Sequence, residues 1–255
     1  MATVILGLVC EGPTDIALLK KISLYQAKDN NVNLEIRVLS PQKDATSGQY
    51  QGGWTRIRSW CKAHSGSSGQ NNNYINKMGL NVSKLSQFQA TLQWKSVLKA
   101  AGISKLLIQM DTDIAEEIDD TPKSFNPKKD IRKDYCKLSI NFWLGVKAVE
   151  PELLYLMTTY ALETWILATY DEKDNQSVFP SRILDYETLP DWEEKLIALG
   201  LPARIKKGRL RLLKWDGYYK GAYFNRIIRN IDVVRRRCIE FVNFETMLAT
   251  LISMS

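Results

Sequence analysis

The stretch VILGLVCEGPTD, residues 4–15, is an apolar run that ends in a carboxylate and a Gly-Pro turn. Residues 4–10 lack polar alternation and are rich in aliphatic side chains, which predicts a buried strand. Pro13 is tolerated at the first turn of a helix, and Thr14 or Asp15 can cap one. We therefore expect a strand, a tight turn at Glu11-Gly12 and a helix that continues through Ile22.

A second apolar run ends in carboxylates about one hundred residues later. Residues 106–113 read LLIQMDTD, and we expect a buried strand over 105–110. Asp111 and Asp113 are two positions apart, a spacing that puts two side chains on the same face of a strand. Chemistry collects at the carboxyl ends of the strands in an open α/β sheet, so Glu11 can join them if the two strands are adjacent.

Three carboxylates at one place indicate a hard divalent cation. Like charges repel by about 4 kcal/mol at roughly 4 Å and an effective dielectric of 20, so such a group needs a metal, a basic partner or full solvation. The chain has one histidine, His64, and four scattered cysteines without a CxxC pair. This composition disfavours zinc and favours Mg²⁺ or Mn²⁺. We expect the cysteines to be reduced thiols.

The segments between these runs predict an α/β fold. Residues 33–39 alternate as a second strand, which gives a βαβ beginning and hence a mostly parallel sheet. Residues 42–82 are rich in Gly, Ser and Asn and are interpreted as an insertion with a short helix over 55–63. The insertion is either a loop without function or a substrate-gating loop. An amphipathic helix is expected over 83–101, where Gly102 ends it.

The second half of the chain changes from apolar to basic. We expect a strand within 152–160 and a helix over 161–170, with a domain boundary near residue 172. Residues 1–171 would form the metal-binding domain, and residues 172–255 a basic, mainly helical region. The formal charge of +7 and the isoelectric point of about 9.1 favour an anionic partner, nucleic acid first.

The two acidic strand ends resemble the Toprim domain, the metal-binding α/β module of topoisomerases, primases and OLD-type nucleases. Glu11-Gly12 after the first strand and Asp111-x-Asp113 after a later one carry the resemblance over residues 4–171. It implies that Glu11 acts as general acid/base or metal ligand and that Asp111 and Asp113 bind Mg²⁺. Glu163, in the stretch LETWILA (162–168), resembles a further family motif and becomes a second candidate metal ligand. An ordinary surface glutamate beside a core Trp165 is the alternative.

Basic residues of the last third are candidates to hold a polyanion. They could neutralise phosphates, and Trp215, Tyr218 and Tyr219 could stack on bases. A solvated basic face, or a face for an acidic partner, is the alternative. The candidates for nucleic-acid binding are Lys206, Lys207, Arg209, Arg211, Lys214 and Lys220.

These observations lead us to expect a Mg²⁺-dependent Toprim-type endonuclease that cleaves DNA or RNA. The resemblance implies an anti-phage effector controlled by an ATPase, which would be a separate ABC- or AAA-type subunit because this sequence has no GxxxxGK[ST] motif. A homodimer is a further expected assembly. One alternative is a haloacid-dehalogenase-like phosphatase, whose DxD motif Asp111-Thr112-Asp113 resembles, although Ala115 departs from that pattern. The other is a non-catalytic nucleic-acid-binding or regulatory subunit with a degenerate acidic site.

Membrane insertion is not expected from the sequence. Residues 4–10 are too short to span a bilayer and have no basic residues before them. No other stretch has about eighteen uninterrupted apolar residues. We therefore expect a cytoplasmic protein with no membrane partner.

Overall fold

A computed structural model describes residues 3–42, 52–65, 93–206, 208–213 and 222–253. The chain forms two compact units, which are described separately. The first contains residues 1–13 and 33–157, and the second contains residues 14–32 and 158–254. The helix that follows the first strand thus belongs with the later part of the chain, a grouping that the predicted boundary near residue 172 does not anticipate.

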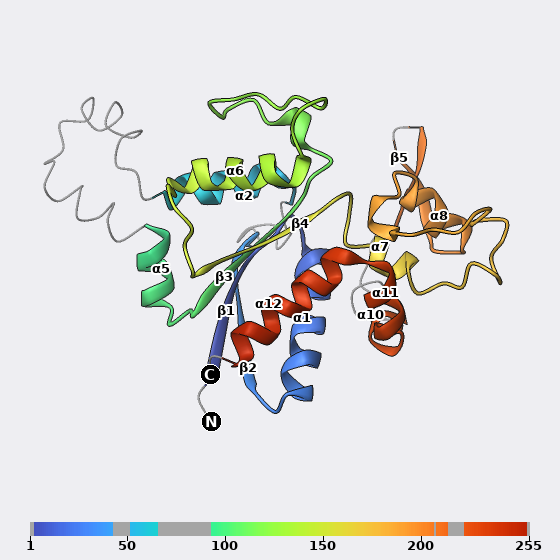
Figure 1. The fold of residues 1–255 in the computed structure, drawn as a ribbon, viewed down its shortest axis with the longest axis horizontal. Coiled ribbons are helices and arrows are strands. Elements are labelled where there is room, and N and C mark those ends of the chain that lie inside the picture. Colours follow the sequence, from blue (N-terminus) through green and yellow to red (C-terminus); the bar gives the residue numbers. More distant parts are fainter. Residues whose placement is uncertain (1–2, 43–51, 66–92, 207, 214–221, 254–255) are drawn as a thin grey trace, which may run out of the picture. The chain divides into compact units, whose positions relative to one another are not determined.

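A parallel four-stranded sheet forms the framework of the first unit (Figure 1). Its strands are β1 (Thr3–Val9), β2 (Asn33–Ser40), β3 (Lys105–Asp111) and β4 (Leu153–Thr158), in the order β2-β1-β3-β4. Strand β1 pairs in parallel with β2 on one side and with β3 on the other. The α/β class, the parallel sheet and all four expected strands are confirmed.

The strand order reverses between β1 and β3. Successive strands proceed from β1 to β2 in one direction, and the chain then returns to place β3 on the other side of β1. Such a reversal is a topological switch point, the place where ligands bind outside the carboxyl ends of a parallel sheet. The two acidic strand ends therefore meet at the position where an α/β fold builds its sites.

Three helices, α2 (Trp54–Ala63), α5 (Trp94–Ala100) and α6 (Arg132–Leu144), share one hydrophobic core with the sheet. Ile57 and Cys61 of α2 and Cys136, Ile140 and Trp143 of α6 belong to this core, and each is at most 2% exposed. A short 3₁₀ helix, η1 (Ala115–Glu117), follows β3. The sequence pattern predicts α2 but not α6, because exposed Leu138 and Phe142 interrupt the apolar spacing of α6.

Only part of the helix expected over 83–101 lies among the described residues. Helix α5 begins at Trp94, after Gln93 in an extended conformation, and ends before Gly102, whose φ is 62°. Residues 83–92 and most of the predicted 42–82 insertion lie outside the described part of the chain. Their expected helix and loop stay predictions.

The second unit is mainly helical and contains one hairpin. Strands β5 (Ala203–Lys206) and β6 (Arg209–Leu212) pair antiparallel within residues 172–255, which were expected to be mainly helical. The helix expected over 161–170 is confirmed only as a short one, α7 (Thr164–Leu167). The remaining elements are α1 (Pro13–Asp29), η2 (Tyr186–Thr188), α8 (Trp192–Ala198), α10 (Ala222–Arg229), α11 (Ile231–Arg237) and α12 (Ile239–Ser253).

Trp165 lies at the centre of the second unit. Its ring contacts Phe241 edge-on at 5.0 Å and stacks on Phe244 at 6.2 Å between centroids. Its indole N–H donates to Oε1 of Glu187 at 2.6 Å.

The helices that the structure describes include none with the length and apolar character that a membrane span requires.

Candidate active site

Glu11 and Asp111 are joined by a hydrogen bond at the switch point. The backbone N–H of Asp111 donates to Oε1 of Glu11 at 2.9 Å. Strands β1 and β3 end at Val9 and Asp111, so both carboxylates lie at the same edge of the sheet. The adjacency of the two acidic strand ends, on which the sequence argument depends, is present in the structure.

Gln109 forms a hydrogen bond with each of these two residues. Its side-chain oxygen accepts from the backbone N–H of Glu11 at 3.4 Å, a long hydrogen bond, and its Nε2 donates to Oδ1 of Asp111 at 3.0 Å. The side chain is fully buried within β3. A buried amide is stable only when its polar atoms are satisfied, and here both ends of the amide contact the site. Gln109 was not among the predicted site residues, although a lone amide in an apolar strand, two residues before a carboxylate, is a signal that could have indicated it.

Asp113 lies beyond the strand. Strand β3 ends at Asp111, Thr112 is buried, and Asp113 occupies the turn before η1 with an exposed side chain. The expectation that strand alternation places Asp111 and Asp113 on one face is therefore wrong, because alternation requires extended backbone through both residues.

Arg132 holds the turn that carries Asp113. Its Nη1 donates to the carbonyl oxygens of Thr112 and Asp113, each at 3.3 Å, and to Oε2 of Glu116 at 2.5 Å. Although Asp113 is exposed to solvent, the surrounding protein atoms partly desolvate its carboxyl group and raise its pKa. The neighbouring Glu117 raises this pKa further, while Arg132 opposes both effects. The Asp113 carboxyl group therefore lies where an added cation would stabilise its ionised form.

The start of α2 contacts the backbone of Glu11. The N–H of Gly53 donates to the carbonyl oxygen of Glu11 at 2.7 Å. A Cβ atom on Gly52 would come within 2.8 Å of that oxygen, so only glycine allows the two segments to approach this closely. Trp54 stacks on Trp143 of α6 with ring centroids 6.3 Å apart, which connects this contact to the hydrophobic core.

All four cysteines are buried, and none of them is part of a disulfide. Burial raises the pKa of Cys136 to about 12, and the negative charge of Glu11 adds to this effect. A thiol with so high a pKa stays protonated and unreactive at neutral pH. The structure places all four cysteines in buried positions, and their reduced state stays a prediction.

Glu163 belongs to the second unit. It lies immediately before α7, where its carbonyl oxygen accepts from the N–H of Ile166 and Leu167, and its side chain is 2% exposed. The interpretation of Glu163 as a surface glutamate is wrong, because the residue is almost completely buried. Its role as a metal ligand stays a prediction.

The described basic candidates lie on the β5–β6 hairpin. Lys206, Arg209 and Arg211 are all exposed, and Nε of Arg211 contacts Oε2 of Glu193 at 2.8 Å. Lys207, Lys214 and Lys220, together with Trp215, Tyr218 and Tyr219, lie outside the described residues. Arg226 and Arg237, by contrast, donate hydrogen bonds within their own unit. Arg226 donates to the carbonyl oxygen of Thr169, and Arg237 donates to those of Ala168 and Tyr170.

The carboxylates at the switch point have the oxygen donors that Mg²⁺ prefers, but they are too few to fill its coordination sphere alone. Among the residues that the structure describes, no three His, Cys, Asp or Glu side chains form a group that could hold a metal ion. Glu11 and Asp111 provide hard oxygen donors at adjacent strand ends. Mg²⁺ in proteins is commonly held by one or two carboxylates together with waters and substrate phosphates, so this pair fits such a site.

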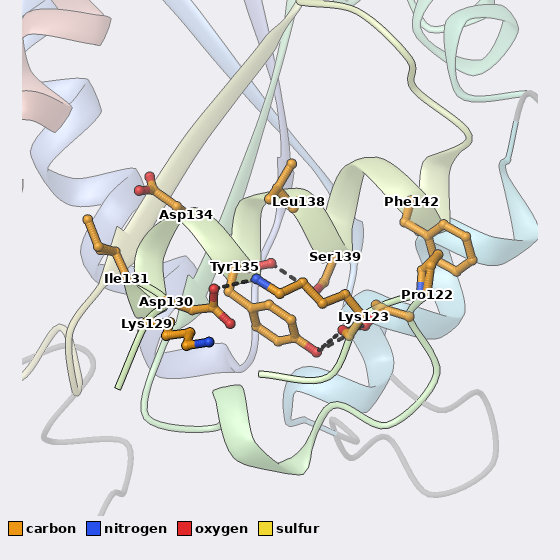
Figure 2. A pocket seen from close by; sticks show the side chains of 11 residues that line it. Pro122, Lys123, Lys129, Asp130, Ile131, Asp134, Tyr135, Leu138, Ser139 and Phe142 are labelled. Carbon is orange, nitrogen blue, oxygen red and sulfur yellow. Dashed lines mark hydrogen bonds and ion pairs between the residues drawn. The ribbon is translucent and has the colours of Figure 1, made fainter. Parts of the chain in front are cut away.

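A separate cavity of about 330 Å³ lies against the outer side of α6 (Figure 2). Leu138, Phe142 and Ile131 contribute apolar surface, and Lys123 pairs with Asp130 at its edge. The Tyr135 hydroxyl hydrogen-bonds to the carbonyl group of Lys123 at 3.1 Å and interacts with Thr121 at 2.9 Å. None of the predicted site residues lines this cavity.

The fold and the site define an α/β protein with a pair of carboxylates at the switch point of a parallel sheet. Comparisons with protein-family models, with curated proteins and with solved structures gave no match.

Proposed function

We propose that the chain is a Mg²⁺-dependent nuclease of the Toprim type. The observation that carries the proposal is the hydrogen bond between Asp111 N–H and Glu11 Oε1, which joins the two strand ends that resemble Toprim motifs. The parallel sheet and the position of this pair at a switch point agree with such a fold.

Glu11 and Asp111 would hold the cation, and the turn at Asp113 would add a nearby negative charge. Bound Mg²⁺ would supply charge stabilisation for a phosphate oxygen and a more acidic water molecule. Glu11 would hold or transfer a proton as general acid/base, and Gln109 would orient the Asp111 carboxylate. Arg132 would position the Asp113 turn through the two carbonyl groups that it contacts.

The substrate in this proposal is nucleic acid, DNA or RNA, held through basic residues of the second unit. The resemblance further suggests an anti-phage effector that a separate ATPase subunit controls. A site of this kind can be silent until the partner releases it, so metal binding and cleavage are tested separately.

The test uses the full chain with plasmid DNA and with total RNA, in Mg²⁺, Mn²⁺ or EDTA. Asp111→Asn should abolish cleavage, whereas Asp119→Asn should leave it unchanged because Asp119 is an exposed residue of the same acidic region. Isothermal titration with Mg²⁺ should show binding to the native chain that is lost in Asp111→Asn. Hydrolysis of a phosphomonoester without nucleic-acid cleavage would favour the phosphatase. Absence of both Mg²⁺ binding and cleavage would overturn the proposal in favour of a non-catalytic subunit.

A further inference from the structure

The β5–β6 hairpin has one cationic face and one apolar face. In its register, Arg204 pairs with Arg211 and Lys206 with Arg209, while Ile205 pairs with Leu210. Because side chains alternate along a strand and directly opposite residues share a face, the four cations lie together and the two apolar residues lie on the other side. We call the side formed by Arg204, Lys206, Arg209 and Arg211 the cationic face.

The hairpin is anchored at one end and exposed at the other. Leu212 is 6% exposed and its N–H donates to Oε1 of Glu193 in α8 at 2.7 Å. Further along, Ile205 is 77% exposed and Leu210 is 53% exposed. The outer part of the ribbon is therefore open on both faces, and the face opposite to buried Leu212 is the cationic one.

The cationic face lacks enough acidic partners within the described part of the chain. Arg211 pairs with Glu193, but no acidic side chain among the described residues forms an ion pair with Arg204, Lys206 or Arg209. Like charges directly opposite each other on an antiparallel pair are destabilising. Two such pairs on a ribbon with four residues in each strand favour an external polyanion that offsets this repulsion.

We propose that the cationic face binds the phosphate backbone of duplex DNA, with the ribbon lying in the major groove. This inference rests on the proposed nuclease function and specifies its substrate. A two-stranded ribbon fits the major groove of B-form DNA, which is about 12 Å wide, whereas the major groove of an RNA duplex is too narrow. Single-strand sites use aromatic platforms, and the described residues of the ribbon include no aromatic side chain.

The experiment measures binding of the full chain in EDTA, so that cleavage does not enter. Affinities for a 25-base-pair DNA duplex, the matching RNA duplex, tRNA and single-stranded DNA are compared between about 50 and 200 mM salt. Substituting Arg204, Lys206 and Arg209 together with Ser should weaken duplex DNA binding at least about tenfold at low salt. The slope of log K against log salt should fall by about 2 to 3, because up to three phosphate contacts are lost.

Two matched variants control for net charge and for the choice of face. Replacing the exposed Lys28, Lys99 and Lys128 with Ser removes the same charge elsewhere. Replacing Ile205 and Leu210 with Ser alters the opposite face of the same ribbon. Both controls should stay within about threefold of the native affinity, and circular dichroism should show that all three variants are folded.

Several results would overturn the inference. One is a loss of duplex DNA affinity in the charge control or in the apolar-face variant that equals the loss in the cationic-face variant. Another is tighter binding of RNA or of single-stranded DNA than of duplex DNA. A third is an unchanged DNA affinity in the cationic-face variant. A chain that binds DNA as expected but neither binds Mg²⁺ nor cleaves nucleic acid would contradict the nuclease proposal alone. If the chain cleaves nucleic acid and the cationic-face variant binds DNA as tightly as the native chain, only the hairpin inference is contradicted.

Discussion

Asp111 donates its backbone N–H to the carboxylate of Glu11, one hundred residues earlier in the chain, at 2.9 Å. The contact uses the backbone of Asp111 and the side chain of Glu11, and it brings the two acidic strand ends together at one edge of the sheet. Such a concentration of negative charge is typical of functional sites, where a bound cation or substrate offsets the repulsion between the charges.

Neutralising either carboxylate should cost activity but not stability. Glu11→Gln keeps an oxygen that can accept from Asp111 N–H, and both Glu11→Gln and Asp111→Asn relieve repulsion between like charges. We expect each to lower Mg²⁺-dependent cleavage at least about 100-fold. Without Mg²⁺, each should unfold at or slightly above the native temperature.

Thermal unfolding with and without Mg²⁺ measures this directly. Mg²⁺ should raise the unfolding temperature of the native chain, because a ligand that binds only the folded state stabilises it. It should leave both variants unchanged. An equal shift in all three proteins would show that Mg²⁺ binds elsewhere.

Gln109→Met should destabilise the protein and weaken Mg²⁺ binding together. The substitution keeps the approximate volume but removes the acceptor for Glu11 N–H and the donor to Asp111 Oδ1. A buried hydrogen-bonding arrangement lost in this way costs about 1 to 3 kcal/mol. Urea unfolding and Mg²⁺ titration measure the two effects, and Leu107→Met, at a buried apolar position of the same strand, controls for packing.

Gln109→Glu tests whether Gln109 orients the Asp111 carboxylate or only fills space in the core. It restores an acceptor for Glu11 N–H but places a second negative charge beside Asp111, which raises the pKa of both carboxyl groups. Mg²⁺ affinity near neutral pH should fall more than in Gln109→Met and should recover as the pH rises. A pH-independent loss would contradict a positioning role.

Arg132 and Glu117 should shift the titration of Asp113 in opposite directions. Arg132 opposes the raised pKa of Asp113 and Glu117 contributes to it. Arg132→Met should therefore move the acid limb of Mg²⁺-dependent cleavage to higher pH, and Glu117→Gln should move it to lower pH. Arg132→Lys keeps the charge but loses the planar donor geometry, so its profile should lie between those of the native chain and Arg132→Met.

The pH profiles are measured with the full chain at constant ionic strength. Mg²⁺ titration at each pH gives the same information if the nuclease is silent. Identical shifts for Arg132→Met and Glu117→Gln would contradict the electrostatic account of the Asp113 turn.

Glu187 should make the protein less stable as the pH rises. Burial raises the pKa of Glu187 to about 7, although donors from Trp165, Glu240 and Phe241 favour its charged form. Its pKa is lower in the unfolded chain, so the favourable contribution is complete below about pH 4 and is lost through pH 7. The shift corresponds to about 3 kcal/mol at most.

Denaturant unfolding between pH 4.5 and 8 measures this dependence. Glu187→Gln removes the titration but places an amide N–H₂ against a backbone N–H, so it should be clearly less stable than the native chain at pH 5. At pH 8 the difference between the two should be smaller. Parallel stability curves would show that Glu187 does not titrate in this range.

The local sequence determined the four strands of the sheet and the identity of the acidic residues at its edge. Aliphatic runs predict β1, β3 and β4, and the Gly-Pro turn predicts the helix that starts at Pro13. These predictions succeed because buried parallel strands and helix starts depend on neighbouring residues. Local signals were insufficient for α6, whose exposed apolar residues obscure its helical period, and for the β5–β6 hairpin, where charge predicted exposure but not conformation.

Only the tertiary structure decided which of these residues meet. The sheet order places β3 beside β1, and this long-range pairing brings Asp111 to Glu11 and inserts Gln109 between them. The same pairing ends β3 at Asp111, so Asp113 follows the geometry of a turn held by Arg132 and not the alternation of a strand. The sequence by itself determined which chemical groups are available at the site, because strand patterns and residue types are local. Their arrangement follows from backbone hydrogen bonds between segments one hundred residues apart, which no local pattern contains.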